Sequence, residues 1–385
     1  MNRISAQLHI VHIVAGLWKD TGGPAEVIPN LCRAQVAAGA KVTLCSIAGD
    51  TAPQVTSLKG SGVDVQLFPA IDKIVRFSPE MARYVKSLHS VDIIHNHGHW
   101  LWPNWFASAV ALSLRAKLVT TPHGTLVPGM LESSSVKKWF AWRLFDKRII
   151  DRADIIHALS GAERDLMAPK LGPYSTRKVR VIANGVHKGE NTGQHTRKDS
   201  GTLLFLSRVA PIKGLVPLLL AWQRLAPRFP GWDLKIIGPI DQSFSAEVTQ
   251  LVDRSERAVL VGPIYSDERW KYYRDASAFI LPTFGEGLPT VLLEAAAYNL
   301  PIITTIEANF DELNAAGGSI LTHPTSDAIE ATLSNFFKLS GDERKEIGDR
   351  GAALVSSSYG WSAIASQWLS VYSSLRSNFD NGTNS

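Results

Sequence analysis

Cysteine is scarce in this sequence, with Cys32 and Cys45 as its only two residues. Two thiols are too few for a disulfide framework or a structural zinc site, and this scarcity fits a reducing compartment. No apolar run reaches the roughly 18 residues of a membrane-spanning helix. The N-terminus lacks a basic stretch leading into an apolar core and a cleavage site, so Leu8–Trp18 is interpreted as a strand and loop rather than a signal peptide. We therefore expect a cytoplasmic protein.

Several ligand-binding motifs are also missing. The dinucleotide pattern G-x-G-x-x-G is absent, and so is the Lys-Ser/Thr ending of a P-loop, which argues against a nicotinamide dehydrogenase and a P-loop nucleotidase. No Asp-x-Asp triplet is present to hold Mg²⁺ on a diphosphate. We expect neither a cofactor nor a metal ion.

The composition is that of a globular protein. The chain has 385 residues, of which 45% are hydrophobic and 19% charged, and this excludes a disordered, collagenous or coiled-coil protein. Its length suggests two domains. Residues 1–200 carry 25 basic and 15 acidic side chains, whereas residues 201–385 carry 15 and 20. A basic first half favours an anionic partner, which leaves a membrane surface, a nucleic acid or a phosphorylated substrate open.

Short apolar runs alternate with helix-like stretches along the whole chain. Most of the runs are rich in Val, Ile and Leu, as in parallel strands that are buried on both faces. The pattern predicts an α/β fold with two doubly wound, Rossmann-like parallel sheets that face each other across a cleft. The expected strands are Leu8–Val14, Lys41–Ile47, Val63–Phe68, Asp92–His97, Lys117–Thr121, Asp154–Leu159, Lys178–Ala183, Thr202–Ser207, Leu234–Gly238, Ala258–Val261, Ala278–Leu281, Pro301–Thr304 and Ser319–Leu321.

The polar, glycine-containing stretch between the two series predicts a linker at residues 188–201. We therefore expect an N-terminal Rossmann-like domain over 1–187 and a C-terminal Rossmann-like domain over 202–360. Residues 361–377 are expected to form a helix that packs back on the N-terminal domain, and residues 378–385 a disordered tail.

In open α/β sheets, ligands bind at the carboxyl ends of the strands, so the residues that follow each strand are candidates. In the first half, Gly22 and Gly23 precede a helix whose N-terminus suits an anion. The segment His95–His99 places histidines on one face of an extended chain, which leaves a metal site, a ligand-contacting loop or purely structural histidines open. His123 and Gly124 follow the fifth strand and form either a substrate contact or a structural turn.

The second half carries stronger signals. Arg208 and Lys213 flank the end of its first strand and have the charge to clamp a diphosphate, although they could also be a solvated pair. Glu286 and Glu294 flank the start of a helix near Pro289. If the intervening residues were helical, about 12 Å would separate the two carboxylates, roughly the length of a sugar nucleotide. Each could then accept hydrogen bonds from a pair of vicinal hydroxyls, or both could be solvated glutamates.

With these motifs the chain resembles GT-B fold glycosyltransferases, and in particular glycosyltransferase family 4 of bacterial polysaccharide synthesis. The resemblance covers nearly the whole chain. It depends most on F-G-E-G-L-P with the two glutamates, then on Arg208 with Lys213, on A-N-G-V before the linker, on P-H-G-T-L around His123, and on the closing segment that begins at Tyr359. His187 and Ser207 depart from the residues that the family often has, Asp and Gly.

The resemblance implies that the N-terminal domain binds the acceptor and that the C-terminal domain binds the donor nucleotide. It also implies a role for each candidate residue. Arg208 and Lys213 neutralise the donor diphosphate, Glu286 binds sugar hydroxyls, and Glu294 binds the ribose. His123 lies beside the transferred sugar. Further donor contacts are implied for Gly22, Gly23, Gly287, Leu288, Pro289 and Thr290.

The resemblance also implies a retaining, metal-independent hexosyl transfer from a nucleotide sugar to a glycan acceptor, in exopolysaccharide, capsule or O-antigen (lipopolysaccharide) synthesis. We expect a lipid-diphosphate-linked acceptor and no nucleic acid. Residues 133–152 are basic and aromatic, which suits either an anionic membrane surface at the inner face of the plasma membrane or an ordinary core helix. The alternatives are a sugar-nucleotide 2-epimerase of the same fold and a non-catalytic sugar-nucleotide-binding protein.

Overall fold

The computed structural model describes residues 7–18, 23–126, 142, 146–187, 200–264 and 268–382, the last five of these by backbone alone. The chain divides into two compact units. The first contains Met1–Gly185 together with Trp361–Ser385, and the second contains Val186–Gly360.

The first unit is built on a seven-stranded sheet in the order β3-β2-β1-β4-β5-β6-β7, with every neighbouring pair parallel. This order places β1 and β4 side by side at the point where the winding of the sheet reverses. The strands are β1 His9–Val14, β2 Lys41–Ile47, β3 Asp64–Phe68, β4 Ile93–His97, β5 Lys117–Thr121, β6 Ile155–Ala158 and β7 Val179–Val181.

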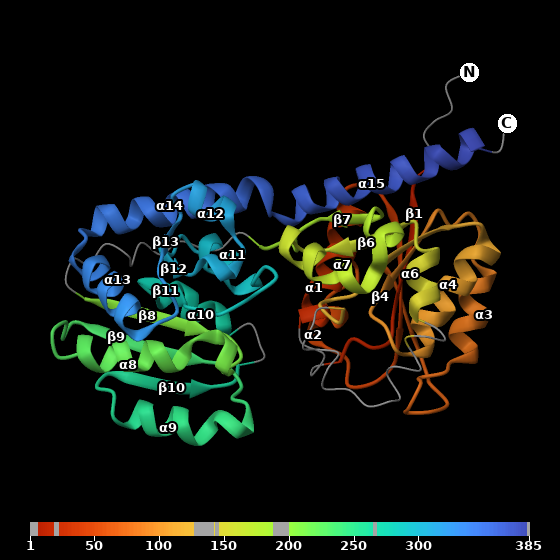
Figure 1. The fold of residues 1–385 in the computed structure, drawn as a ribbon. Helices are drawn as coiled ribbons and strands as arrows, with labels where there is room; N and C mark the ends of the chain where they lie inside the picture. The colour runs from red at the N-terminus through yellow and green to blue at the C-terminus, as the bar shows by residue number, and fades with distance from the viewer. Residues whose placement is uncertain are drawn as a thin grey trace. The chain divides into compact units, whose positions relative to one another are not determined.

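The second unit has a six-stranded parallel sheet in the order β10-β9-β8-β11-β12-β13, which Figure 1 shows from one edge to the other. Its reversal point lies between β8 and β11. The strands are β8 Gly201–Leu206, β9 Trp232–Ile237, β10 Ala258–Gly262, β11 Ala278–Leu281, β12 Ile302–Thr304 and β13 Ser319–Leu321.

Helices connect the strands in both units, as parallel pairing requires. The first unit has α1 Gly23–Ala37, α2 Pro53–Thr56, α3 Pro79–Ser87, α4 Trp102–Leu114, α6 Lys147–Arg152, α7 Gly161–Thr176 and α15 Trp361–Gly382. The second has α8 Leu215–Leu225, α9 Ser245–Asp253, α10 Arg269–Asp275, α11 Thr290–Ala297, α12 Asp311–Ala315, α13 Ser326–Lys338 and α14 Gly341–Ser358, with short 3-10 turns η3 Pro211–Lys213, η4 Gln242–Phe244 and η5 Ile306–Ala308.

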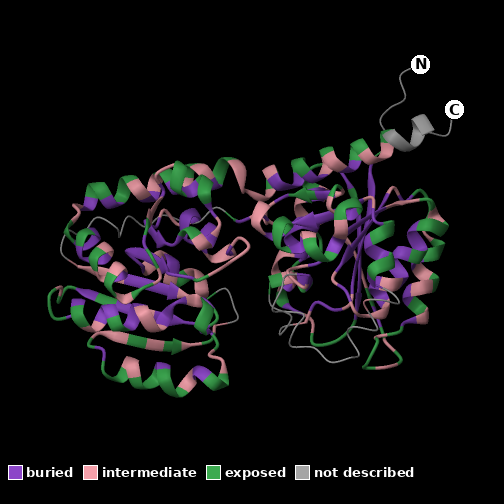
Figure 2. Ribbon diagram, in the orientation of Figure 1, coloured by how far each residue is buried: buried purple, intermediate pink, exposed green. Residues whose placement is uncertain are grey.

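The predicted fold class is confirmed, and each of the thirteen predicted strands is present within two residues of its expected ends. The reason is the burial of the central strands on both faces, which Figure 2 shows in purple in both sheets. In β1, for example, all six residues are buried, His9 and His12 included. A strand of this kind needs a continuous apolar run, which is easily recognised in a sequence.

The C-terminal helix α15 belongs to the first unit. Its Trp368 and Tyr372 are at most 1% exposed and pack with Ile28 and Leu31 of α1. The helix continues to Gly382, five residues into the predicted disordered tail 378–385, because no helix-breaking residue precedes Gly382. Residues 188–199 of the predicted linker lie outside the described part, as do residues 383–385.

Candidate active site

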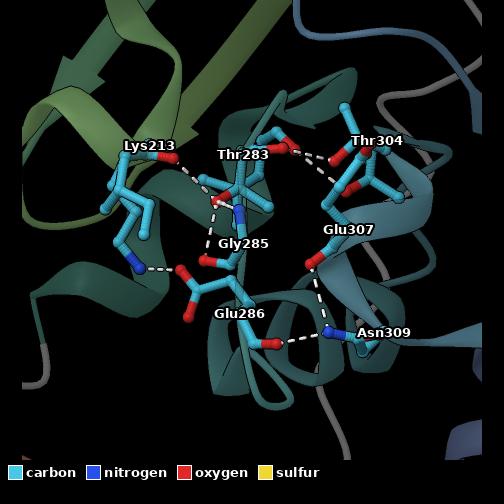
Figure 3. Close-up of polar contacts among 10 residues, drawn as sticks. Lys213, Thr283, Gly285, Glu286, Thr304, Glu307 and Asn309 are labelled. Atoms are coloured by element: carbon cyan, nitrogen blue, oxygen red, sulfur yellow. Dashed lines mark hydrogen bonds and ion pairs between the residues drawn. The ribbon is translucent and has the colours of Figure 1, made fainter. Parts of the chain in front are cut away.

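The carboxyl edge of the second sheet carries the candidate donor-binding residues. The loop after β8 and the loop after β11 are joined there by hydrogen bonds. The backbone N–H of Phe284 donates to the carbonyl of Ile212 at 2.8 Å, and the Thr283 hydroxyl donates to the same carbonyl at 2.9 Å. On the other side, Thr305 donates its hydroxyl hydrogen to the carbonyl of Thr283 at 2.6 Å. The β11 loop is thus held between its two neighbours (Figure 3).

Gly214 allows these two loops to approach each other. It ends η3 with a φ of 71°, and a Cβ atom at this position would lie 1.9 Å from the carbonyl oxygen of Pro282. Any other residue would therefore have to move the backbone of one loop. The glycine places Lys213 directly beside the β11 loop.

Lys213 and Glu286 form an ion pair, with side chains only 15% and 16% exposed (Figure 3). The backbone around Glu286 is fixed as well, because its N–H donates to the carbonyl of Glu307 at 2.9 Å and its own carbonyl accepts from the Asn309 side chain. The sequence assigned Lys213 to a phosphate and Glu286 to a sugar. The structure brings these two side chains into contact with each other.

Arg208 is the exposed cation of the site. Burial of Lys213, and next the positive charge of Arg208, lower the pKa of Lys213 to about 8, while the contact with Glu286 favours the charged ammonium. The guanidinium and the ammonium therefore lie close enough to repel each other. An anion bound between them would relieve that repulsion.

Glu294 is 9% exposed, and Tyr273 and Arg269 are among its partners. Tyr273 of α10 donates its hydroxyl hydrogen to Glu294 Oε2 at 2.7 Å, and the Arg269 guanidinium lies 3.4 Å from Oε1. A carboxylate has about four acceptor positions, so it can accept further hydrogen bonds. The sequence analysis missed Tyr273 and Arg269, because nothing in their spacing links α10 to α11.

Glu286 lies in a loop and Glu294 on a helix, as predicted, but the helical rise does not apply to the whole segment between them. Helix α11 begins only at Thr290, with Pro289 as its N-cap residue, so half of the intervening segment is loop. Proline fixes its own φ but favours an extended residue before it, which keeps Leu288 out of the helix. Gly287 lies in this partly buried loop, and Leu288 packs against the core.

His123 lies in the first unit, in the turn after β5, with a φ of 52° and a partly exposed side chain. Its Nε2 atom is 3.1 Å from Nδ1 of His97. Burial, with the neighbouring imidazoles of His157 and His99, lowers the pKa of His123 to about 3, so its ring is neutral. Gly23 is the first residue of α1, whereas Gly22 lies outside the described residues.

His95 and His97 are buried on β4, and His12 of β1 lies beside them. Ring nitrogens of the three lie within 4.8 Å of one another, a spacing that suits a metal ion. However, all six ring nitrogens are within hydrogen-bonding distance of a protein group. A metal ion would have to displace several of these hydrogen bonds, so the arrangement favours a hydrogen-bonded network.

Most of the basic aromatic segment 133–152 lies outside the described residues. Its Trp142 packs against the core of the first unit, together with Trp102 and Trp105. For these tryptophans the structure agrees with the core alternative. Among the helices that the structure describes, none is both long and apolar enough to cross a membrane.

Two family models match the chain. Residues 22–185 match the glycosyl transferase 4-like domain, and residues 200–338 match the glycosyl transferases group 1 model. Together they cover more than three quarters of the chain. With the two doubly wound sheets, these matches define a GT-B glycosyltransferase. The chain belongs to the family 4 type of these enzymes.

Relatives and solved structures agree with this assignment. The chain is 25% identical to a GDP-mannose:cellobiosyl-diphosphopolyprenol alpha-mannosyltransferase of Xanthomonas oryzae, over 95% of this chain and 96% of that protein. It is 31% identical to an uncharacterized glycosyltransferase of Haemophilus influenzae, over 40% of this chain and 42% of that protein. Its fold is similar to that of Anabaena HepE in complex with UDP and glucose, with a TM-score of 0.70 at 18% identity, covering 96% of this chain and all of that one.

Proposed function

We propose that the protein transfers a hexose from a nucleotide-diphosphate sugar to a glycan acceptor, with retention of the anomeric configuration and without a metal ion. The observation that carries this proposal is the pair of cations at the carboxyl edge of the second sheet. Arg208 is exposed, Lys213 is largely buried, and the two repel each other. A diphosphate supplies two negative groups that can pair with these two cations.

Each of the remaining candidates has a role in donor binding in this proposal. Glu286 accepts hydrogen bonds from sugar hydroxyls, and Glu294 accepts from the ribose. His123, with Gly22 and Gly23, belongs to the sugar and diphosphate end. The segment Gly287–Thr290 offers further donor contacts, of which Pro289 supplies no N–H.

The proposed reaction needs charge stabilisation more than a protein nucleophile. As the bond from the anomeric carbon to the phosphate oxygen breaks, negative charge develops on the leaving diphosphate, and Arg208 and Lys213 are already in place to stabilise it. The departing phosphate takes the proton of the acceptor hydroxyl on the same face of the sugar. The absence of an Asp-x-Asp triplet supports the choice of protein cations over Mg²⁺.

The acceptor in this proposal is a glycan on a lipid diphosphate, in bacterial exopolysaccharide, capsule or O-antigen synthesis. The Xanthomonas relative is named for a diphosphopolyprenol acceptor, and the excess of basic residues in the first half suits an anionic membrane surface. The donors of these proteins differ, since that relative is named for GDP-mannose and the Anabaena structures contain UDP or UDP-glucose. The proposal therefore includes UDP, GDP and ADP as alternatives for the nucleotide of the donor.

The test is a thermal-shift panel of UDP-, GDP- and ADP-sugars, followed by transfer to polyprenyl-diphosphate-linked glycans. A ligand present at a hundred times its Kd stabilises the protein by about 2.7 kcal/mol, which gives a clear shift. We expect one nucleotide class to stabilise the protein and NMR of the product to show the anomeric configuration of the donor. An inverted product would contradict the retaining mechanism. Binding without transfer to any acceptor would favour the sugar-nucleotide-binding alternative.

A further inference from the structure

Two rows of hydrogen bonds cross the sheet of the first unit. The first row begins at the carbonyl oxygen of Ile182, which lies 2.6 Å from Nε2 of His157. Nδ1 of His157 is 3.0 Å from the Thr121 hydroxyl, which is 2.7 Å from Nε2 of His95. Nδ1 of His95 is 2.7 Å from the hydroxyl of Tyr372 on α15. The side chains of His95, Thr121 and His157 thus connect Tyr372 of α15 to the backbone carbonyl of Ile182, just after β7.

The second row ends at the candidate active-site histidine. Oε1 of Gln35 lies 2.8 Å from Nε2 of His12, and Nδ1 of His12 lies 2.8 Å from Nε2 of His97. Nδ1 of His97 is 3.1 Å from Nε2 of His123. The two rows also stack, since the ring centroids of His95 and His97 are 4.2 Å apart.

All five histidines of these rows are neutral at physiological pH. Burial lowers the pKa of His12 and of His157 to about 4, and burial with neighbouring histidines lowers that of His95 and His97 well below the ordinary value. A neutral imidazole has one N–H donor and one acceptor nitrogen. In a row of such rings, the position of one hydrogen therefore determines the position of the next.

The Ile182 carbonyl determines the direction of the first row, because a carbonyl can only accept. Nε2 of His157 must carry the hydrogen, and its Nδ1 then accepts from the Thr121 hydroxyl. The Thr121 oxygen accepts from Nε2–H of His95. Nδ1 of His95 in turn accepts from the Tyr372 hydroxyl. The Tyr372 oxygen is left as an acceptor.

Gln35 lies between the two rows, because its side chain acts on Tyr372 and its Oε1 contacts His12. Burial raises the pKa of Tyr372 well above its ordinary value, and the Gln35 side chain acts on it in the opposite sense, as an amide N–H near the phenol oxygen does. Among the described residues, the buried Nε2 of Gln35 has no partner at ordinary hydrogen-bonding distance, so Tyr372 offers the acceptor that this nitrogen needs. The amide oxygen then faces His12, where it accepts from Nε2–H.

The second row follows from that orientation. Nδ1 of His12 accepts from Nε2–H of His97, and Nδ1 of His97 accepts from Nε2–H of His123. We propose that the two rows act as one tautomer lock, which holds His123 in its Nε2–H form and makes its Nδ1 an obligatory hydrogen-bond acceptor. Gln35, Thr121 and Tyr372 are its positioning residues. Given the proposed function, the group that Nδ1 accepts from is a hydroxyl of the donor sugar.

The direct test is NMR of the full-length protein labelled with ¹⁵N-histidine, since the ¹⁵N shifts distinguish the two tautomers. In the wild type we expect His12, His95, His97, His123 and His157 to be neutral and in the Nε2–H form alone from pH 6 to 8. An Nδ1–H form of His123, or a mixture, would overturn the proposal.

The substitution Thr121→Val removes the link between His157 and His95 while keeping the shape of the side chain. We expect second, Nδ1–H signals for His95, His12, His97 and His123, but not for His157, which keeps its carbonyl partner. Thr43→Val is the matched control, because Thr43 is equally buried and lies 3.3 Å from His9 Nε2 outside the two rows. Unchanged tautomers in Thr121→Val would overturn the lock. If that variant does not fold, Tyr372→Phe breaks the connection between the rows and is expected to release His12, His97 and His123.

The kinetic test separates this proposal from the proposed function. In Thr121→Val we expect transfer to slow about tenfold, the effect of one misdirected hydrogen bond, and Thr43→Val to keep the wild-type rate. With the deoxy-sugar donor that lacks the hydroxyl bound by His123, the two variants should be equally fast. An equal deficit with every deoxy donor would contradict the role at the sugar. If the tautomers are as stated and the wild type transfers no sugar, the proposed function fails while the lock stands.

Discussion

Lys213 and Glu286 are in contact across two loops that are 73 residues apart in the sequence. Neither side chain is free to act on a ligand without affecting the other. Arg208, by contrast, is exposed at the same sheet edge. The ion pair therefore links the proposed phosphate and sugar ends of the donor site.

The substitutions Arg208→Ala and Lys213→Met are expected to reduce turnover by about 10²–10³, the usual cost of losing one charge-stabilising contact. Steady-state kinetics with a saturating acceptor would measure the effect. Arg224→Ala is the control, since Arg224 is paired on the surface with Asp327 and Glu330 and lies outside the site. Wild-type turnover in both site variants would exclude the diphosphate clamp.

Tyr273→Phe tests the arrangement around Glu294. It removes the hydroxyl that donates to Glu294 Oε2 at 2.7 Å and leaves the ring in place. Losing one hydrogen bond of about 0.5–1.5 kcal/mol should weaken nucleotide binding roughly two- to tenfold. Calorimetric titration with the free nucleotide measures this, and Tyr272→Phe, one residue away, serves as the control. Equal affinities in the two variants would argue against a role of Glu294 in ribose binding.

Gly214→Ala is expected to lower both stability and activity. The new methyl group would meet the Pro282 carbonyl, so the backbone that carries Lys213 must shift. Gly60 provides a control, because it also has a positive φ, of 82°, and has nothing within 4 Å of a Cβ. Gly60→Ala should show only the backbone strain of about 1 kcal/mol in thermal melts and keep its activity. Full activity in Gly214→Ala would show that the close approach of the loops is unimportant.

The buried histidines predict an acid-sensitive fold. Their folded pKa values lie below the unfolded value of 6.5, so the unfolded chain binds more protons as the pH falls. Stability is fully present above pH 6.5 and is lost toward pH 4, by up to about 1.4 kcal/mol per pH unit for each histidine.

Urea unfolding between pH 7.5 and 4.5 would measure this dependence. His157→Gln should make the slope shallower, whereas His89→Gln, at an exposed position, should leave it unchanged. A free energy of unfolding that does not change over this range would mean that the histidines are not buried as neutral rings.

The fold could be predicted from the sequence because its strands are buried on both faces and therefore form continuous apolar runs. The candidates that follow strand ends could also be predicted, because parallel strands bring their carboxyl ends to one edge of the sheet. Contacts between distant segments could not be predicted from the sequence. The pairing of Lys213 with Glu286 depends on how closely Gly214 lets two loops approach, and no local pattern encodes that distance.

The histidine rows could be predicted only in part from the sequence. The spacing of His95 and His97 correctly places both on one face of a strand, but it does not distinguish a metal site from a hydrogen-bonded network. His12 could have been added, because the 3-2-1-4 strand order pairs β1 with β4 and aligns His12 with His95. Gln35 and Tyr372 lie on helices, and their positions depend on packing that the sequence does not reveal.

The most direct test of the proposed function is the binding of the nucleotide-sugar donor in the presence of excess EDTA, measured by calorimetry for the wild type and Arg208→Ala. We predict that the wild type binds with the same affinity with and without the chelator, and that the variant binds at least tenfold more weakly in both. Loss of wild-type binding in EDTA, or equal affinity in the variant, would contradict it.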